Sequence, residues 1–172
     1  MSMVNGLSHI TFIVRSLDRM EELLTGILGA SKIYDSGDET FSLSRERFYL
    51  VGGKPGNPDA PSPIWIAAME GEPLSERTYN HIAFKIPEAD YDLYLKRVQK
   101  LGLEVREGRA RLEGEGRSIY FYDDDNHMFE LHTGSLSERL ACYARGVGKS
   151  GPPTPARVRT FDCRPWESPL RT

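Results

Sequence analysis

The sequence predicts an α+β fold built from two similar βαβββ modules, and three observations carry this prediction. The segment LSHITFIV at 7–14 is similar to YNHIAFKI at 79–86, and each contains one histidine at the same place. A helical pattern and then a glycine, Gly29 or Gly102, follow each segment. Short strand-like runs come next in both copies. Two copies are too few for a solenoid, so the repeat indicates a duplicated half of one domain.

In the first module, residues 7–14 are predicted to form a strand because they are apolar and β-branched. Apolar side chains then recur at helical spacing from Leu17 to Leu28, which predicts an amphipathic helix that ends at Gly29. The glycine- and proline-rich segment 52–63 is expected to be a surface loop. Further strands are expected at 31–35, 40–43, 48–51 and 64–69, with a turn at 36–38.

The second module repeats this order. A strand at 81–86 is followed by Pro87, which is expected to open a helix with apolar residues between Tyr91 and Leu101. Strands at 103–106, 118–122 and 128–132, a tight turn at 123–126 and a closing helix at 135–145 complete the prediction. The domain is thus expected to span 5–145, with modules at about 5–70 and 77–135, and the proline-rich segment 146–172 is expected to be a flexible tail.

The composition argues against several classes of partner. The 22 Lys+Arg and 25 Asp+Glu residues give a formal net charge of −3, which leaves no basic footprint for nucleic acid or an anionic membrane surface. No apolar run reaches the roughly 18–20 residues that a membrane span needs. The first residues lack the features of a signal peptide, and two cysteines form no disulfide framework. We therefore expect a cytoplasmic protein without nucleic-acid or membrane partners.

A candidate metal site follows from the two histidines of the repeat. Alternate side chains of a strand share a face, so His9 and His81 should point away from the apolar core face of their strands. Glu130 should point with His132 from a later strand. Two imidazoles and a carboxylate hold a divalent metal and leave coordination positions open. His132 and His127 are the competing histidines, although His127 follows the 123–126 turn and is interpreted as closing it.

Several separate motifs then resemble a known family. GLSHITFIV, SGDETFSLSRERFYL, ERTYNHIAFKI and GEGRSIYFYDDDNHMFELHTGSLSERL are similar to the vicinal oxygen chelate superfamily, and more narrowly to fosfomycin-resistance proteins of the FosX type. The resemblance covers about residues 5–145. It implies the vicinal oxygen chelate fold, a domain-swapped homodimer whose paired modules form a metal cleft, and Mn²⁺ or another divalent metal held by His9, His81 and Glu130.

The resemblance also implies a reaction. Fosfomycin-resistance enzymes open the epoxide of fosfomycin with a thiol or with water, and in the water-adding type a glutamate general base falls on Glu46. A potassium loop of the thiol-using relatives corresponds to 109–118, where Gly114 replaces a serine, so that monovalent site is in doubt. Substrate-binding positions implied by the resemblance are Thr11, Trp65, Tyr79, Tyr120 and Arg139, of which Arg139 matches a residue that binds the phosphonate group of fosfomycin. Arg111 is a second candidate for binding this phosphonate.

The leading expectation is therefore metal-dependent addition of water to the epoxide of fosfomycin, which gives a vicinal diol. A thiol transferase on the same metal site is the first alternative. Another metalloenzyme of the superfamily, such as an extradiol dioxygenase, a glyoxalase or an enzyme for another small epoxide or phosphonate, is the second. A binding module that sequesters an antibiotic is the third, and the proposed metal ligands argue against it.

Overall fold

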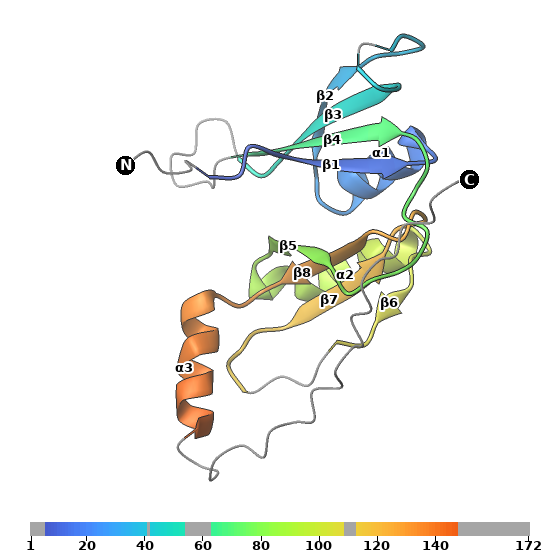
Figure 1. Cartoon of the computed structure of the whole chain (residues 1–172). Helices are drawn as coiled ribbons and strands as arrows, with labels where there is room; N and C mark the ends of the chain where they lie inside the picture. Colours follow the sequence, from blue (N-terminus) through green and yellow to red (C-terminus); the bar gives the residue numbers. More distant parts are fainter. Residues whose placement is uncertain (1–5, 41, 54–62, 109–112, 148–172) are drawn as a thin grey trace, which may run out of the picture.

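The computed structural model describes residues 6–40, 42–53, 63–108 and 113–147. These residues form two modules, each with a four-stranded sheet and a helix, and the modules follow one another along the chain (Figure 1). The strand orders are β1-β4-β3-β2 and β5-β8-β7-β6, which are the same order in each module. The predicted duplicated α+β architecture is therefore confirmed.

The first module contains five elements. β1 (His9–Val14) pairs in parallel with β4 (Ile64–Glu70), which pairs antiparallel with β3 (Glu46–Val51). β2 (Ser31–Asp35) forms the far edge beside β3. The helix α1 (Leu17–Gly26) connects β1 to β2, and the Ser16 side chain caps its first turn by accepting a hydrogen bond from a backbone N–H.

The second module has the same plan with two additions, a 3₁₀ turn before its first helix and a helix after its last strand. β5 pairs in parallel with β8, which pairs antiparallel with β7, and the short β6 forms the edge. A third helix follows β8 and extends away from the sheets (Figure 1). The elements are β5 (His81–Lys85), the 3₁₀ turn η1 (Glu88–Asp90), α2 (Tyr91–Lys100), β6 (Val105–Arg106), β7 (Ser118–Tyr122), β8 (Met128–His132) and α3 (Leu136–Val147).

One hydrophobic core joins the two modules. Phe12 of β1 and Phe129 of β8 are buried, and their ring centroids lie 5.2 Å apart. The Phe129 ring also stacks on Phe121 at 5.5 Å. The exposed side chains of His9 and Thr11 alternate with the buried or half-buried ones of β1, as the strand pattern predicts. Each sheet therefore packs one face into the shared core, and the opposite face carries His9 in the first module and His81 in the second.

Beside this core, two arginines of the first module form hydrogen bonds and ion pairs with aspartates of the second. The Arg15 side chain donates to Asp125 with an Nε–Oδ1 distance of 2.7 Å, and the Arg15 backbone N–H donates to the same carboxylate. Arg19 pairs with Asp124 at 2.8 Å. Asp123 accepts backbone N–H bonds from Asp125 and His127, which makes 123–126 the tight turn that the sequence predicts.

The region before β3 differs from the sequence-based expectation. Residues 40–43 do not form the expected strand over the part that the structure describes, Thr40 and 42–43, and Leu43 is 87% exposed. Instead, Ser36 and Glu46 exchange hydrogen bonds, and β3 begins at Glu46 rather than at Phe48. The described residues between them, 37–40 and 42–45, form turns, bends and irregular structure instead of a strand. The predicted strand at 103–106 is likewise reduced to two residues.

Some expectations fall outside the described residues. These are most of the expected loop at 52–63 and nearly all of the tail expected from 146 onward. Within the described ranges, none of the helices is long and apolar enough to cross a membrane.

Candidate metal centre

His81 and Glu130 meet on adjacent strands. β5 and β8 are parallel, and Ala83 lies opposite Glu130, so the His81 side chain can lean along the strand toward the carboxylate. The His81 Nε2 and Glu130 Oε2 atoms are 2.9 Å apart, and Glu130 is only 4% exposed. The second module thus brings together two of the three predicted metal ligands, His81 and Glu130.

The second nitrogen of His81 tests whether this pair fits a metal. Nδ1 lies 2.8 Å from the backbone carbonyl oxygen of Tyr79, and a carbonyl can only accept, so Nδ1 carries a proton. In the neutral ring, the lone pair of Nε2 then faces the Glu130 carboxylate. Two lone pairs at this distance require a cation between them, either a second proton or a metal ion. This donor pair therefore fits a metal site.

The spacing agrees with that conclusion. Imidazole nitrogens and carboxylate oxygens lie about 2.1 Å from a bound divalent metal, so two ligands at right angles are about 3 Å apart. The observed separation of 2.9 Å between Nε2 and Oε2 is compatible with this length, and it is also that of a hydrogen bond through a shared proton. His81 and Glu130 need little rearrangement to bind one ion.

The surroundings keep Glu130 ionised. Burial by itself works to raise the pKa of this carboxyl group, because it penalises the charged form. Side-chain hydrogen bonds from Ser118 and Tyr120 favour the carboxylate. The imidazoles of His81 and His132 act in the same direction, and the pKa of Glu130 lies below its usual value. An ionised carboxylate is the form that binds a metal.

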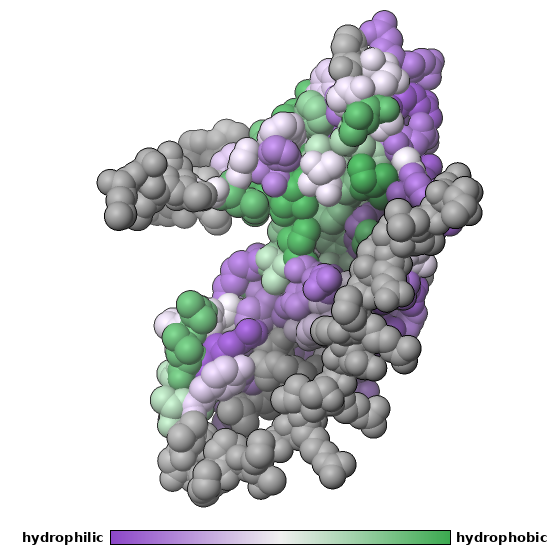
Figure 2. Space-filling view, in the orientation of Figure 1, coloured by the Kyte–Doolittle hydropathy of each residue, from purple (hydrophilic) through white to green (hydrophobic). Residues whose placement is uncertain are grey.

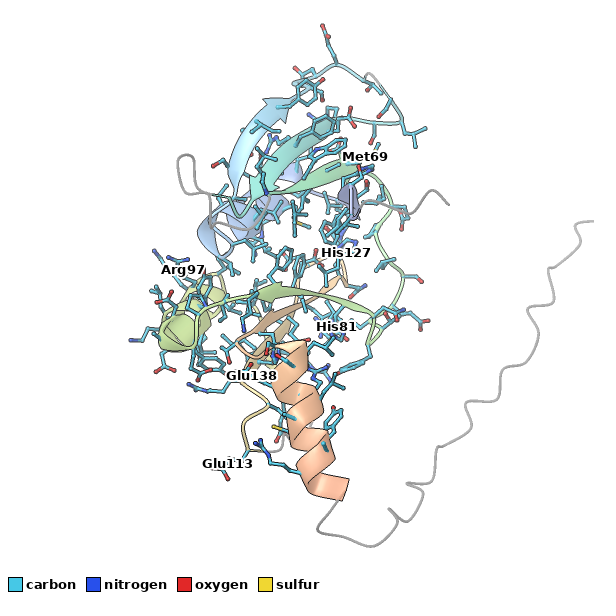
Figure 3. All side chains as sticks on the ribbon, turned by 90° about the vertical axis from the view of Figure 1, so that its left-hand side faces the viewer. Met69, His81, Arg97, Glu113, His127 and Glu138 are labelled. Atoms are coloured by element: carbon cyan, nitrogen blue, oxygen red, sulfur yellow. The ribbon has the colours of Figure 1, made fainter. Side chains whose placement is uncertain are left out.

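His9 lies apart from this pair within one chain. Its exposed ring lies against Trp65, with ring centroids 4.4 Å apart, and its Nδ1 is 3.1 Å from the Ser8 hydroxyl. No three metal-ligating side chains gather among the residues that the structure describes. Figure 3 shows His81 on the second module and Met69 on the first, with His127 between them. The His127 ring is paired with Asp123 at 2.7 Å, which agrees with its predicted role in closing the turn.

Glu46 lies on the same sheet face as His9. It is opposite Met69 on β4, and alternation along the sheet places Glu46, Phe48 and Thr11 on this one face. The Glu46 side chain is 8% exposed and accepts a hydrogen bond from the Ser42 hydroxyl at 3.1 Å. It is the first residue of β3, so its backbone is held by pairing with Met69 of β4.

The other predicted site residues are divided between the modules. Thr11 and Trp65 belong to the first sheet, and the Trp65 Nε1 donor is buried without a partner among the described residues. Tyr79 and Tyr120 surround His81, with ring centroids 5.1 and 5.6 Å from the imidazole. Arg139 lies on α3, and Arg111 falls outside the described residues.

Sequence reasoning missed one residue of this centre. Ser118 of β7 donates a hydrogen bond to Glu130 Oε1 and lies 2.8 Å from Nδ1 of His132. The predicted strands carried a usable signal, because Ser118 pairs with His132 if 118–122 and 128–132 form a hairpin. From the sequence alone, His132 is interpreted only as a competing metal ligand.

Comparison with known proteins places these features in a family. Residues 6–131 match the model of the Glyoxalase/Bleomycin resistance protein/Dioxygenase superfamily. The chain belongs to this superfamily. Among its relatives is the fosfomycin resistance protein FosX of Mesorhizobium japonicum, which is 60% identical over 145 residues, or 84% of this chain and 97% of the relative.

Two further relatives bear on the chemistry. A crystal structure of a glutamate-to-glutamine variant of FosX from Listeria monocytogenes, complexed with Mn(II) and 1S,2S-dihydroxypropylphosphonic acid, has a TM-score of 0.70 and 48% identity. The match covers 82% of the present chain and 99% of the Listeria chain. The metallothiol transferase FosB of Bacillus licheniformis is 44% identical over 80% of this chain and 81% of its own length.

Proposed function

We propose that this protein is an Mn²⁺-dependent hydrolase that adds water to the epoxide of fosfomycin and gives a vicinal diol, which confers resistance to the antibiotic. The observation that carries the proposal is the identity to FosX, 60% over 97% of that relative. The structure of the Listeria relative supports it, because a dihydroxypropylphosphonic acid bound with Mn(II) is what water addition to an epoxypropylphosphonic acid would produce.

The proposed metal ligands are His9, His81 and Glu130. A bound divalent metal supplies Lewis-acid stabilisation of the negative charge that develops on the epoxide oxygen, which is worth several kcal/mol. The protein's own contribution is to hold the proton of His81 on Nδ1 through the Tyr79 carbonyl, which directs Nε2 at Glu130, and to keep Glu130 ionised. Both ligands are thus prepared to bind a cation.

Glu46 is proposed as the general base. The oxygen of water attacks one epoxide carbon as the carbon–oxygen bond breaks, and the water gives its proton to Glu46. The ring oxygen takes up a proton from solvent and Glu46 returns its proton to solvent, so that epoxide and water together become the diol. A positioned carboxylate that removes this proton contributes typically about 10²–10⁴-fold. The hydrogen bond from Ser42 and the fixed start of β3 orient the carboxylate.

The remaining predicted residues are proposed to bind the substrate. A phosphonate needs cationic and hydrogen-bonding partners, which arginine, tyrosine and threonine side chains supply. Trp65 would form an apolar wall next to His9, with which its ring is in contact. The proposed contacts to the substrate are Thr11, Trp65, Tyr79, Arg111, Tyr120 and Arg139.

We further infer a homodimer with swapped modules. His9 lies away from His81 and Glu130 within one chain, so a second copy that brings its first module to this second module would supply the third ligand. The helix α3 supports a partner here, because Leu136, Leu140 and Tyr143 expose 72%, 56% and 42% of their surface, and hydrophobic surface is visible over this helix in Figure 2. The low cysteine content fits a reducing, cytoplasmic location, which remains part of the proposal.

The test is to incubate the purified full chain with Mn²⁺ and fosfomycin and to follow ³¹P NMR and product mass, with and without glutathione or bacillithiol. We expect a diol phosphonate that carries one added water and forms equally well without thiol. A product that contains the thiol would instead assign the thiol transferase activity, which the similarity to FosB makes the second candidate. No change in fosfomycin with Mn²⁺ present would contradict both functions.

A further inference from the structure

A chain of three polar side chains runs across β7 and β8 behind the proposed metal ligand. Ser118 and His132 lie directly opposite each other in the antiparallel pair, and the Ser118 hydroxyl is 2.8 Å from His132 Nδ1. The same hydroxyl donates to Glu130 Oε1. The His132 Nδ1 atom is also 3.2 Å from the backbone carbonyl oxygen of Arg117.

The direction of each hydrogen bond follows from the chemistry of the partners. The Arg117 carbonyl can only accept, so Nδ1 of His132 carries a proton and shares it between that carbonyl and the Ser118 oxygen. The Ser118 hydroxyl has one proton, and the ionised Glu130 can only accept it. The serine therefore accepts from the histidine and donates to the glutamate.

The backbone fixes the position of the His132 ring. Gly134 lies against it, and a Cβ atom at this position would be 2.7 Å from His132 Nε2 and 2.3 Å from the Glu115 carbonyl oxygen. A side chain larger than glycine would therefore displace the ring. The ring is only partly exposed, at 14% of its side-chain surface. The imidazole thus has little freedom to turn its Nδ1 away from Ser118.

We propose that His132 is a positioning residue that acts through Ser118 to hold Glu130 Oε1, so that Oε2 is presented to the metal beside His81. This inference rests on the proposed role of Glu130 as a metal ligand. The Oε2 atom faces His81 Nε2 at 2.9 Å, whereas Oε1 receives the serine proton. The carboxylate is held with one oxygen directed at the proposed ion.

The first module supports this assignment by contrast. The strand register places Met69 at the position that corresponds to His132, and Glu46 at the position that corresponds to Ser118. Ala67 occupies the position of Glu130, so this module has no carboxylate to orient. The chain of hydrogen bonds from His132 through Ser118 to Glu130, which we call the relay, is thus present in the module that carries the proposed carboxylate ligand. Partners that orient a metal ligand in this way typically contribute 10–100-fold to metal affinity.

The test compares three substitutions at one position by isothermal titration of the full chain with Mn²⁺. His132→Ala and His132→Gln should weaken Mn²⁺ binding by about 10–100-fold, since neither places an N–H donor at Nδ1. His132→Asn should stay within about threefold of wild type, because its amide nitrogen can occupy the Nδ1 position and donate to Ser118. His127→Asn is the matched control, a histidine that pairs with Asp123, and should leave the affinity unchanged.

Two results would overturn the relay: unchanged affinity in His132→Ala, or equal weakening in all three variants, which would mean that packing of the ring matters rather than its N–H. Circular dichroism of each variant separates loss of folding from loss of binding. Glu130→Ala separates this inference from the proposed function. If Glu130→Ala binds Mn²⁺ normally, the proposed metal site itself is wrong; if it loses Mn²⁺ while His132→Ala does not, only the relay is wrong.

Discussion

The two modules have the same strand order but present different chemistry on their open faces. Each contributes one histidine, His9 or His81, at the start of its first strand. On the next strand of the sheet, the second module carries Glu130 where the first carries Ala67. The duplicated backbone therefore keeps the histidine in both copies, while the carboxylate that we propose as a metal ligand is found in one of them.

The neighbouring positions differ in the same direction. The second module places the hydroxyl groups of Tyr120 and Ser118 around its carboxylate, whereas the first has Phe48 and Glu46 at the corresponding positions. The first module thus offers a histidine, an apolar wall and a carboxylate at a different place. A site that combines one module of each kind would contain three metal ligands and a separate base, which two modules of the same kind would not provide.

The largest expected effect on turnover comes from substituting the two histidines that the modules share, His9 and His81. His9→Ala and His81→Ala should each abolish turnover, because a site with three protein ligands has none to spare. If modules from two chains share a site, mixing the two inactive variants after dissociation should restore about a quarter of wild-type activity, since half of the dimers are mixed and each has one intact site. Diol formation measured by ³¹P NMR reports the result.

This mixing experiment has a clear opposite outcome. If each site is formed within one chain, both partners of a mixed dimer remain defective and no activity returns. The control is a mixture of His81→Ala with Glu130→Ala, which changes the same module in both chains. That mixture should stay inactive in either arrangement.

A smaller but still large effect is expected at Glu46. Glu46→Gln keeps the size of the side chain and removes its basicity, so diol formation should fall by roughly 10²-fold or more while Mn²⁺ affinity is kept. Glu39→Gln, an exposed glutamate in the segment before β3, is the matched control and should have wild-type activity. Hydrolysis within a few-fold of wild type in Glu46→Gln, or loss of Mn²⁺ binding, would contradict the assignment of Glu46 as base.

An exchange between the modules gives a moderate effect. Tyr120→Phe gives the second module the side chain of the first and removes a hydrogen bond to the Glu130 carboxylate, so Mn²⁺ affinity should fall by about tenfold. The reciprocal Phe48→Tyr adds a hydroxyl in the module without the carboxylate and should leave the affinity unchanged. Titration calorimetry measures both, and equal affinities in the two variants would argue against the asymmetry.

The smallest effect is expected from the C-terminal segment. The FosX relative from Mesorhizobium japonicum aligns over 145 residues, which is 97% of its length, so it has little chain to match residues 148–172. Removal of 148–172 should change Mn²⁺ affinity and turnover by less than about twofold, because a proline-rich segment without an apolar pattern buries little surface. An insoluble or inactive truncated protein would show that this segment contributes to the folded unit or to the dimer.

Local patterns in the sequence predict the architecture and the strands that carry the candidate metal ligands. The repeat of LSHITFIV, the helical spacing after it and the alternation along the strands are local patterns. They predicted both modules and the face of the strand on which each of His9, His81 and Glu130 lies. The roles of Glu46 and of the phosphonate-binding residues came from the family resemblance. Local periodicity carries this information because the side-chain direction in a strand depends on the residue number along it.

Features that depend on contacts between distant segments are visible only in the folded chain. It showed that Ser36 fixes the start of β3 at Glu46, that the Tyr79 carbonyl leaves Nε2 of His81 to face Glu130, and that His9 stays apart within one chain. It also connected His132 to Glu130 through Ser118. These facts depend on the register of paired strands and on hydrogen bonds that distant residues make, and the residue types alone do not specify either.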